Sequence, residues 1–386
     1  MLNLQSKFSS CNALILAFTF FLSLRFPGYA TAIPILGSLI VFLLHNRFSV
    51  RIYCGFFFAI TLLLIFTFIH LDSLKGAVKI IACIFSYFVM HSLVNSPYTD
   101  VANTRSLFRK LVVFFLIYSF IETILRMFFG DYFTSSTSVR DSQYALNDFF
   151  ALGKFYQYKG GSPFFTDSNF AGLFLFCWFI FHVHFKSFIF SRKTYYFVTF
   201  LFTVVAFFTF SRSLYLSFLF VYLFKEFFDR FKKSYYIYLV PIILLLSSIV
   251  VVNVFLFLSD DGSLNTKLDI WRSLFSNFFE YPIINQLFGF GLEQGKYIYS
   301  YREGGSSHAL IPQLVGDVGI IGLILYTLSL IYIFGKVENG LIYFLGIFLI
   351  GFSLFDPWDP LVFAIAGLLN FKFDPYYIDN YKFTER

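Results

Sequence analysis

Three ionisable side chains stand where polar sequence meets apolar sequence, and each is of a type that handles anions or protons. His308 ends the polar stretch "EGGSSH", immediately before the apolar run that begins at Ala309. Arg212 separates two apolar runs in "FTFSRSLYLSF", and Lys267 begins the segment "KLDIWRSLF". An imidazole accepts a proton near neutral pH, and guanidinium and ammonium groups stabilise negative charge. These residues predict acid–base chemistry on an anionic substrate beside an apolar phase.

Each of these residues also has a plainer interpretation. A single histidine before a helix often serves as a cap or lies at an interface, and Arg212 could touch lipid headgroups from a simple hairpin. Asp167 in "TDSN" has the pattern of a helix cap. We favour a functional role for His308 because cations of the same polar stretch surround it. The other histidines lack that setting; they are His45, His70, His91, His182 and His184.

The composition indicates that the apolar phase is a lipid bilayer. Of the 386 residues, 58% are hydrophobic and only 13% are charged, against about 25% charged in soluble domains. The 62 phenylalanines and 26 tyrosines exceed what a water-soluble core of this length needs. The net charge of +7 does not indicate nucleic acid, because lysines and arginines occur in short clusters between apolar runs. We therefore expect an integral membrane protein that has no nucleic-acid partner.

Apolar runs close to the length of about 20 residues that a bilayer requires predict an all-α fold with about 12 transmembrane helices. They form one membrane domain, residues 1–386, and we expect spans at 12–24, 29–45, 52–71, 76–94, 111–129, 169–187, 194–210, 213–224, 235–258, 309–334, 340–355 and 360–371. The run after Lys7 has the charge and length of a signal peptide. Because a second span follows at Tyr29, we expect an uncleaved anchor.

This order of spans obeys the positive-inside rule when the N-terminus is cytoplasmic. The turns then assigned to the cytoplasm carry most of the basic residues, namely Arg47, Arg51, Arg105, Arg109, Lys110, Lys186, Arg192, Lys193, Lys225, Arg230, Lys232, Lys233, Lys336, Lys372, Lys382 and Arg386. Both termini are expected in the cytoplasm. Residues 130–168 and 259–308 are then two long loops on the opposite, outer face.

Both outer loops contain several basic side chains and are rich in glycine, serine and aspartate. The first contains Arg140 and Lys159, and the second contains Arg302 close to His308. From Lys267 to Phe279, apolar residues recur at helical spacing, which predicts a helix along the membrane surface with Lys267 and Arg272 near headgroup level. Its apolar side is expected to hold Leu268, Trp271, Leu274, Phe275 and Phe278. We interpret the glycines of "GFGLEQG" as turns, because no strand precedes them.

Neither the cysteines nor the histidines form a metal-binding pattern. All four cysteines lie in or beside hydrophobic segments, at Cys11, Cys54, Cys83 and Cys177. His182 and His184 are two residues apart on an expected helix, so their rings point in different directions. We expect neither a metal, a cofactor nor a disulfide framework.

With these segments in this order, the chain resembles the O-antigen polymerase and O-antigen ligase superfamily of bacterial envelope glycosyltransferases. The resemblance covers most of the chain. It rests on "SPFFTDSNFAGLF", "FSRSLYLSF", "KLDIWRSLF" followed by "LFGFGLEQG", and "SSHALIPQLVGDVGIIGLILY". It implies a multi-pass protein of the bacterial inner membrane that acts on lipid-linked sugars at the periplasmic face.

The resemblance also implies roles for particular residues. Arg212 and Lys267 would bind the diphosphate of an undecaprenyl-linked oligosaccharide, and His308 would act on the acceptor hydroxyl without a metal. Arg140 and Lys159 are expected to add to the binding of diphosphate or glycan. Glu293 or Asp167 is the alternative base if His308 only orients the acceptor. The implied partners are the lipid-linked oligosaccharide, membrane lipid, and a chain-length regulator and flippase of the same pathway.

Two positions depart from the family's pattern. Ala309 stands where asparagine is common, which removes an amide beside His308. Lys267 stands where the family has arginine, so bidentate phosphate contact is lost and Arg272 or Arg302 is expected to share that role.

Three functions remain open at this point. Polymerase and ligase share one reaction and differ in the acceptor. Two substantial outer loops that both contain basic side chains favour the polymerase, which handles two diphosphate-bearing substrates. A flippase or other transporter is the alternative from another class, and it requires charges along a central cavity and commonly two similar halves. Charges within the spans are few, chiefly Lys79, Glu122, Arg126 and Asp317. Asp317 is equally suited to bonding a neighbouring helix and to catalysis.

Overall fold

A computed structural model of the chain describes residues 13–19, 22, 74–95, 101–133, 162–165, 167–230, 262–303, 305–352 and 355–372. These residues form helices joined by turns, and the part of the chain described here contains no strand. The expected all-α class is therefore confirmed. The expected number of about 12 spans is not confirmed, because the expected spans at 29–45, 52–71 and 235–258 lie outside the described residues.

Beyond a short helical segment at residues 13–19, the described elements follow the expected apolar runs closely. They are α4 (Leu74–Val94), α5 (Val101–Phe133), α8 (Ser168–His184), α9 (Lys186–Ile189), α10 (Arg192–Phe208), α11 (Arg212–Arg230), α13 (Gly262–Asn277), α14 (Ile283–Phe288), α15 (Leu310–Gly335), α16 (Gly340–Gly351) and α17 (Pro360–Leu368), with short 3₁₀ turns η2 (Phe278–Glu280) and η3 (Gly295–Tyr297). Helices α5 and α11 are longer than the expected spans 111–129 and 213–224, because polar residues continue each helix past its apolar part.

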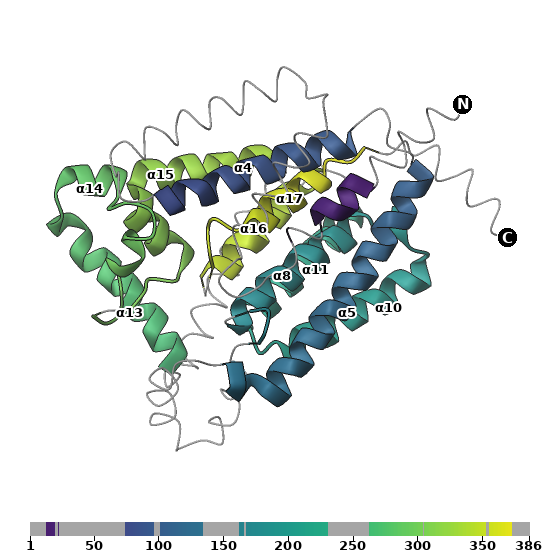
Figure 1. The fold of residues 1–386 in the computed structure, drawn as a ribbon, viewed down its shortest axis with the longest axis horizontal. Coiled ribbons are helices and arrows are strands. Elements are labelled where there is room, and N and C mark those ends of the chain that lie inside the picture. Colours follow the sequence, from purple (N-terminus) through teal and green to yellow (C-terminus); the bar gives the residue numbers. More distant parts are fainter. Residues whose placement is uncertain are drawn as a thin grey trace.

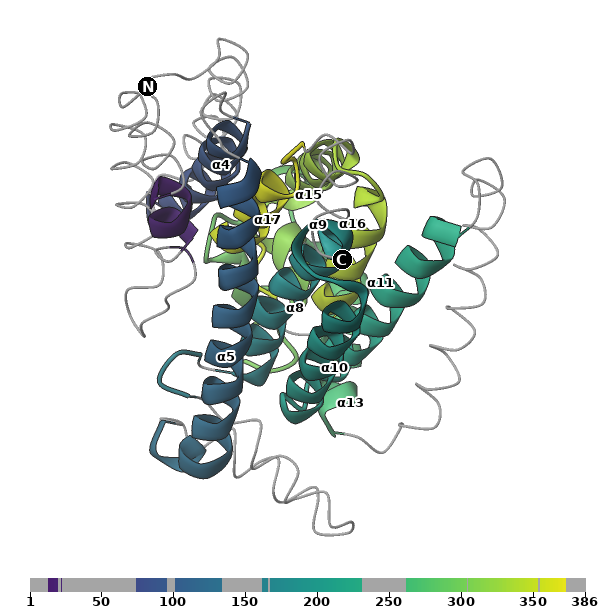
Figure 2. The ribbon, with the colours of Figure 1, turned by 90° about the vertical axis from the view of Figure 1, so that its right-hand side faces the viewer.

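Helix α8 forms the centre of the bundle. Nearly all of its residues are buried, and it contacts α5, α10, α11, α16 and α17. Figure 1 shows α8 between α5 and α16, and Figure 2 shows it between α5 and the pair α10 and α11. Aromatic side chains fill the contacts: Trp178 of α8 stacks on Phe115 of α5 with ring centroids 4.1 Å apart, and Phe179 stacks on Phe218 of α11 at 3.9 Å. The many phenylalanines therefore build the core as well as the surface.

The outward faces of several helices are apolar, as a lipid environment requires. Val101–Phe129 of α5 and Leu310–Gly335 of α15 are long and apolar enough to cross a membrane, and the shorter apolar helices are Lys79–Val94, Ser168–His184 and Gly340–Gly351. On α5, an exposed stripe at helical spacing consists of Val113, Phe114, Ile117, Phe120, Ile121, Ile124 and Phe128. Such contiguous exposed apolar surface is rare on soluble monomers, and it supports a membrane protein.

Charged side chains gather at the two ends of the bundle. At one end, Arg109 of α5 donates to the carbonyl of Ile189 at 3.1 and 3.2 Å, and Lys186 pairs with Glu226 at 3.0 Å. Arg126 lies near the other end of α5. At a rise of about 1.5 Å per residue, the segment from Arg109 to Arg126 is about 26 Å long, close to the hydrocarbon thickness of about 30 Å. The described helices thus have two charged ends separated by roughly one bilayer.

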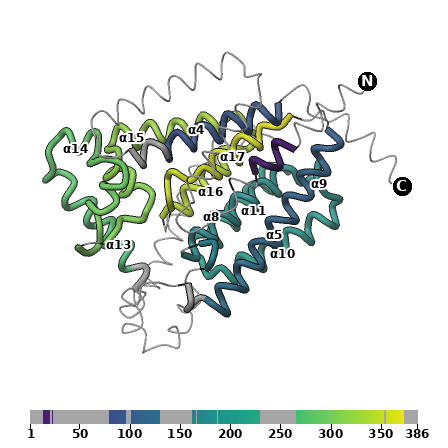
Figure 3. Tube along the Cα trace, in the orientation of Figure 1, coloured from purple at the N-terminus to yellow at the C-terminus, as the bar shows by residue number. Residues whose placement is uncertain are grey.

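The segment from α13 to α14 packs against the beginning of α15, away from α9 (Figure 3). The expected helix at Lys267–Phe279 is present as α13 and η2. Leu274 joins Trp271, Phe278, Tyr299 and Val315 in a small apolar cluster. Phe275 was expected on this side but is 71% exposed, whereas Ile270 is fully buried. The expected apolar face of α13 therefore packs against the chain through Trp271, Leu274 and Phe278, while Phe275 lies at the surface.

Candidate active site

The start of α8 is tied to the turn between α10 and α11 through three polar side chains. Asp167 caps α8, because the backbone N–H of Asn169 donates to Asp167 Oδ1 at 2.7 Å. The Asn169 amide donates to the same oxygen at 2.8 Å, and its own Oδ1 accepts the Ser211 hydroxyl at 2.8 Å. The capping interpretation of Asp167 is confirmed. Asn169 therefore links the Asp167 cap to Ser211, the residue before Arg212.

The turn that precedes Arg212 is tightly held. Phe210 has a positive φ of 55°, which is strained for a residue with a side chain. The Thr209 hydroxyl donates to the Ala206 carbonyl at 2.7 Å, and the Tyr215 hydroxyl donates to the Phe207 carbonyl. Helix α11 begins at Arg212 directly after this turn. The backbone of Arg212 is therefore fixed where α10 ends and α11 begins.

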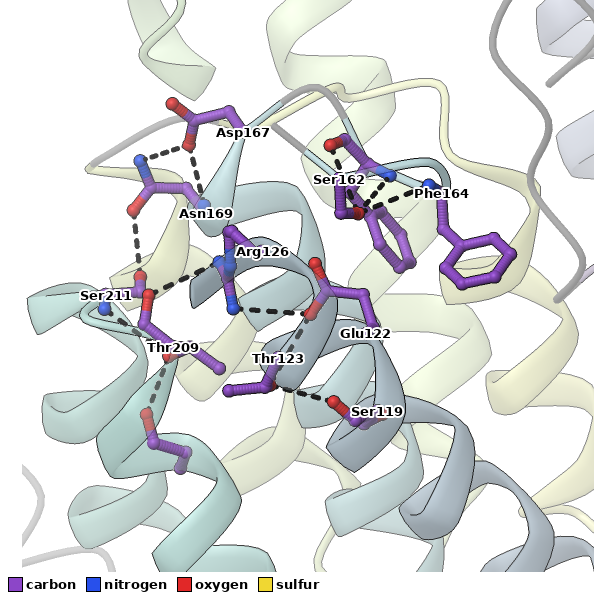
Figure 4. Close-up of polar contacts among 12 residues, drawn as sticks. Ser119, Glu122, Thr123, Arg126, Ser162, Phe164, Asp167, Asn169, Thr209 and Ser211 are labelled. Atoms are coloured by element: carbon purple, nitrogen blue, oxygen red, sulfur yellow. Dashed lines mark hydrogen bonds and ion pairs between the residues drawn. The ribbon is translucent and has the colours of Figure 1, made fainter. Parts of the chain in front are cut away.

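Helix α5 brings a buried ion pair to the same turn. Arg126 pairs with Glu122, one helical turn earlier, at 3.2 Å, and the two side chains are 0% and 2% exposed. The Arg126 guanidinium also donates to the Thr209 carbonyl at 3.5 Å. Figure 4 shows this guanidinium between Thr209 and Glu122, on the side of Asn169. The Tyr215 hydroxyl lies within electrostatic range of both Arg126 and Arg212.

His308 is partly buried directly before α15, and its backbone is anchored on both sides. The Phe355 N–H donates to the His308 carbonyl at 3.1 Å, and Ser307 donates from its backbone and its hydroxyl to the Lys296 carbonyl. His308 Nδ1 lies 2.9 Å from the Ser306 carbonyl oxygen. Because a carbonyl only accepts, Nδ1 must carry the proton, which leaves Nε2 of the neutral ring able to accept one.

Lys267 and Asp167 act on His308 from two other segments of the chain. Burial lowers the pKa of His308 below its ordinary value of 6.5, and the Lys267 ammonium lowers it further. The hydrogen bond to the Ser306 carbonyl and the Asp167 carboxylate oppose this shift. The imidazole is therefore mainly neutral at pH 7. Lys267 and Asp167 therefore lie within electrostatic range of His308, although the three residues lie far apart in the sequence.

Other expected site residues lie elsewhere or outside the described residues. Arg272 is 76% exposed and pairs with Asp269 at 2.9 Å. Arg302 is exposed, with its guanidinium 5.2 Å from the centre of the Tyr301 ring. Glu293 pairs with Lys79 of α4 at 2.9 Å, so a lysine already engages this alternative base. Arg140 and Lys159 lie outside the described residues.

The glycines of "LFGFGLEQG" do more than form turns. Gly289 and Gly291 have φ of 80° and 105°, as expected of turns. Helix α15 breaks at Gly319, and near this break Phe290 and Gly291 donate backbone N–H groups to the carbonyls of Gly316 and Asp317 at 2.8 and 3.1 Å. A Cβ on Gly295 would overlap the backbone of Gly316. Glycine is therefore required so that the loop can lie directly on α15.

Three charged residues, Glu122, Arg126 and Lys79, make contacts that the sequence did not indicate. Glu122 and Arg126 could be recognised as charges four residues apart within an apolar span, but nothing local indicated that they meet the turn before Arg212. Lys79 joins Glu293 at 2.9 Å and Asp356 at 3.6 Å, linking α4 to the glycine loop and to the loop before α17. In the sequence, the only indication of these contacts was that Lys79 lies within an apolar run.

Other candidate ligands are dispersed. His182 Nε2 lies 2.9 Å from the Thr199 hydroxyl, whereas His184 faces Tyr343. Cys83 and Cys177 are free and buried. Among the described residues, no three His, Cys, Asp or Glu side chains converge in a way that could hold a metal ion.

Comparison of the chain with protein-family models and with curated protein sequences finds no match. The function is therefore argued from the residues and their geometry.

Proposed function

We propose that the chain polymerises polyprenyl-diphosphate-linked oligosaccharide repeat units, of the O-antigen type, at the periplasmic face of a bacterial inner membrane. The observation that carries the proposal is that Asp167, which is tied through Asn169 to the residue before Arg212, lies within electrostatic range of His308, as does Lys267. Arg212 begins α11 from the turn that Asn169 and Ser211 tie to the Asp167 cap. A proton acceptor and two cations thus belong to one region where polar turns meet apolar helices.

The reaction follows from these groups. The acceptor is a sugar hydroxyl, and the donor is a glycan joined through its anomeric carbon to undecaprenyl diphosphate. As the hydroxyl oxygen attacks the anomeric carbon, its proton passes to His308 Nε2 and the carbon–oxygen bond to the diphosphate breaks. Negative charge develops on the departing diphosphate, and Arg212 and Lys267 stabilise that charge. Displacement in a single step inverts the configuration at the anomeric carbon.

The position of the site suits a lipid-linked donor. The charged end that holds Arg126 and Asp167 lies about one hydrocarbon thickness from the end that holds Arg109 and Lys186. The polyprenyl chain can remain in the bilayer while its diphosphate lies at headgroup level. No nucleotide sugar is needed, because the diphosphate bond of the donor supplies the driving force.

The same chemistry serves a ligase, in which lipid A-core replaces the second repeat unit as acceptor. We favour the polymerase because there are two long outer loops and both contain basic side chains that could bind a diphosphate. A flippase is the alternative from another class. The described charges Lys79, Arg126 and Glu122 lie near the end of the bundle that carries His308, which suits a surface site better than a central translocation path.

The first test is complementation of a deletion strain, read as a glycan ladder on a gel. Wild type should restore long chains, and Arg212→Ala and His308→Ala should each abolish them, with membrane levels of protein unchanged. A strain that lacks a polymerase leaves core plus one repeat. Loss of a ligase leaves bare core with accumulated lipid-linked polymer, and loss of a flippase leaves bare core without it. Full ladders from both variants would reject the proposed site.

A further inference from the structure

Of the two cations in the proposed diphosphate site, Arg212 and Lys267, one is a lysine. Lys267 offers a point charge and cannot form the two parallel hydrogen bonds that an arginine makes with a phosphate. The arginines of the same loop are placed elsewhere, because Arg272 pairs with Asp269 at 2.9 Å and Arg302 lies exposed over the Tyr301 ring.

The Arg126 side chain is fully buried, but not all of its hydrogen-bond donors have partners among the described residues. A guanidinium has five N–H donors. In Arg126, one terminal nitrogen contacts the Thr209 carbonyl at 3.5 Å and the other contacts Glu122 at 3.2 Å. The buried Nε has no hydrogen-bond partner among the described residues. Burial of an ion pair is costly unless its remaining hydrogen bonds are made, so the Arg126 Nε–H is a donor that an anion could satisfy.

Arg126 also lies where such a partner would be held. Its guanidinium is directed to the turn that precedes Arg212, on the side of Asn169 (Figure 4). Both arginines act on the Tyr215 hydroxyl. Two like charges in one neighbourhood repel each other, and Glu122 is the only carboxylate that the structure pairs with Arg126 among the described residues. An anion that carries more than one charge would stabilise both guanidinium groups.

We propose that Arg126 is a substrate-binding residue that holds the diphosphate of the lipid-linked donor together with Arg212, and that Glu122 orients its guanidinium. This inference rests on the proposed function and deepens it. Arg126 Nε and a terminal nitrogen donate to one phosphate, while Arg212 binds the other. The site therefore recognises a diphosphate in preference to a monophosphate.

The test is a titration of purified protein in detergent with undecaprenyl diphosphate, followed by native mass spectrometry. Undecaprenyl monophosphate, free pyrophosphate and phosphatidylglycerol serve as comparison ligands. We expect Arg126→Lys to weaken undecaprenyl diphosphate binding about 10-fold and the double variant Glu122→Gln/Arg126→Met to weaken it about 10- to 100-fold. Both variants should lose the preference for diphosphate over monophosphate. Free pyrophosphate should bind more weakly than the lipid.

Glu122→Gln keeps the guanidinium but removes the carboxylate that orients it, so its affinity should fall between that of wild type and that of the double variant. A control variant separates this effect from a general loss of charge. Arg192→Met removes an arginine at the opposite end of the bundle and should change nothing. The double variant removes both charges, so it should melt at a temperature close to that of wild type. If it does not fold, Arg126→Lys decides the question.

The possible results of the titration distinguish the inference about Arg126 from the proposed function. Wild-type affinity in Arg126→Lys or in the double variant, with affinity lost in Arg212→Met, overturns the inference about Arg126 and leaves the proposed function intact. Wild-type affinity in Glu122→Gln overturns the orienting role of Glu122. If wild-type protein binds undecaprenyl diphosphate no better than phosphatidylglycerol, the proposed function falls as well.

Discussion

The chemistry of His308 depends on two side chains of opposite charge that reach it from other segments. Lys267 and burial lower its pKa below 6.5, and Asp167 raises it. A base of this kind works only when deprotonated, so the rate constant kcat should fall as the pH drops through the His308 pKa and level off above it.

Lys267→Met and Asp167→Asn should therefore move the acidic limb of the kcat profile in opposite directions. Removal of the ammonium raises the pKa of His308, so the limb of Lys267→Met moves to higher pH. Removal of the carboxylate lowers that pKa, so the limb of Asp167→Asn moves to lower pH, and asparagine still caps α8. The measurement is kcat against pH with extracted lipid-linked repeat units. A limb that neither substitution moves would show that His308 is not the base.

At the residue scale, the sequence predicted the types of group but not their arrangement. Because His308 and Arg212 stand alone at borders between polar and apolar sequence, they could be recognised without a structure. The link from Asp167 through Asn169 to Ser211 could not be recognised from the sequence, because Asn169 and Ser211 are 42 positions apart. The roles of Arg272 and Arg302 depend on which way α13 and its loop face, and periodicity alone does not fix that direction.

The elements that position these groups depend on close backbone contact between the glycine loop and α15. Helix α15 is interrupted at Gly319, and the loop supplies N–H groups to carbonyls next to the break. Sequence predicted turns at these glycines and one apolar helix at 309–334. It could not predict the break or the contact, because both depend on the loop lying against the helix.

Gly295→Ala should destabilise the protein by about 3 kcal/mol, because its methyl group would overlap the backbone of Gly316. Gly335→Ala, at the last residue of α15, is the control: no atom lies within 4 Å of the added methyl group. That control should be neutral or slightly stabilising, since alanine favours a helix. Thermal unfolding of both variants in detergent, followed by circular dichroism, measures the difference. Equal melting temperatures would show that the loop does not pack on α15 in this way.

At the scale of the whole molecule, composition and the length of apolar runs predicted the helical class and most described helices. This succeeded because a helix that faces lipid must be apolar over the thickness of a bilayer, a requirement that is visible in sequence. The packing of α8 at the centre could not be predicted, because a buried helix and a lipid-facing helix are both apolar. Its aromatic contacts with α5 and α11 are visible only in three dimensions.

The two charged ends of the bundle connect this architecture to the proposed reaction. A site at one end can reach a diphosphate at headgroup level while the polyprenyl chain lies along the exposed apolar faces of helices such as α5. The bundle therefore provides a path for the lipid and a polar end for the chemistry.

The most direct test of this account is polymerisation by the purified protein in proteoliposomes, supplied only with lipid-linked repeat units extracted from the deletion strain. Wild-type protein should produce a ladder of lipid-linked polymers and release undecaprenyl diphosphate, one molecule for each bond formed, and His308→Ala should produce neither. Release of no undecaprenyl diphosphate by wild-type protein that is folded and correctly inserted would contradict the account.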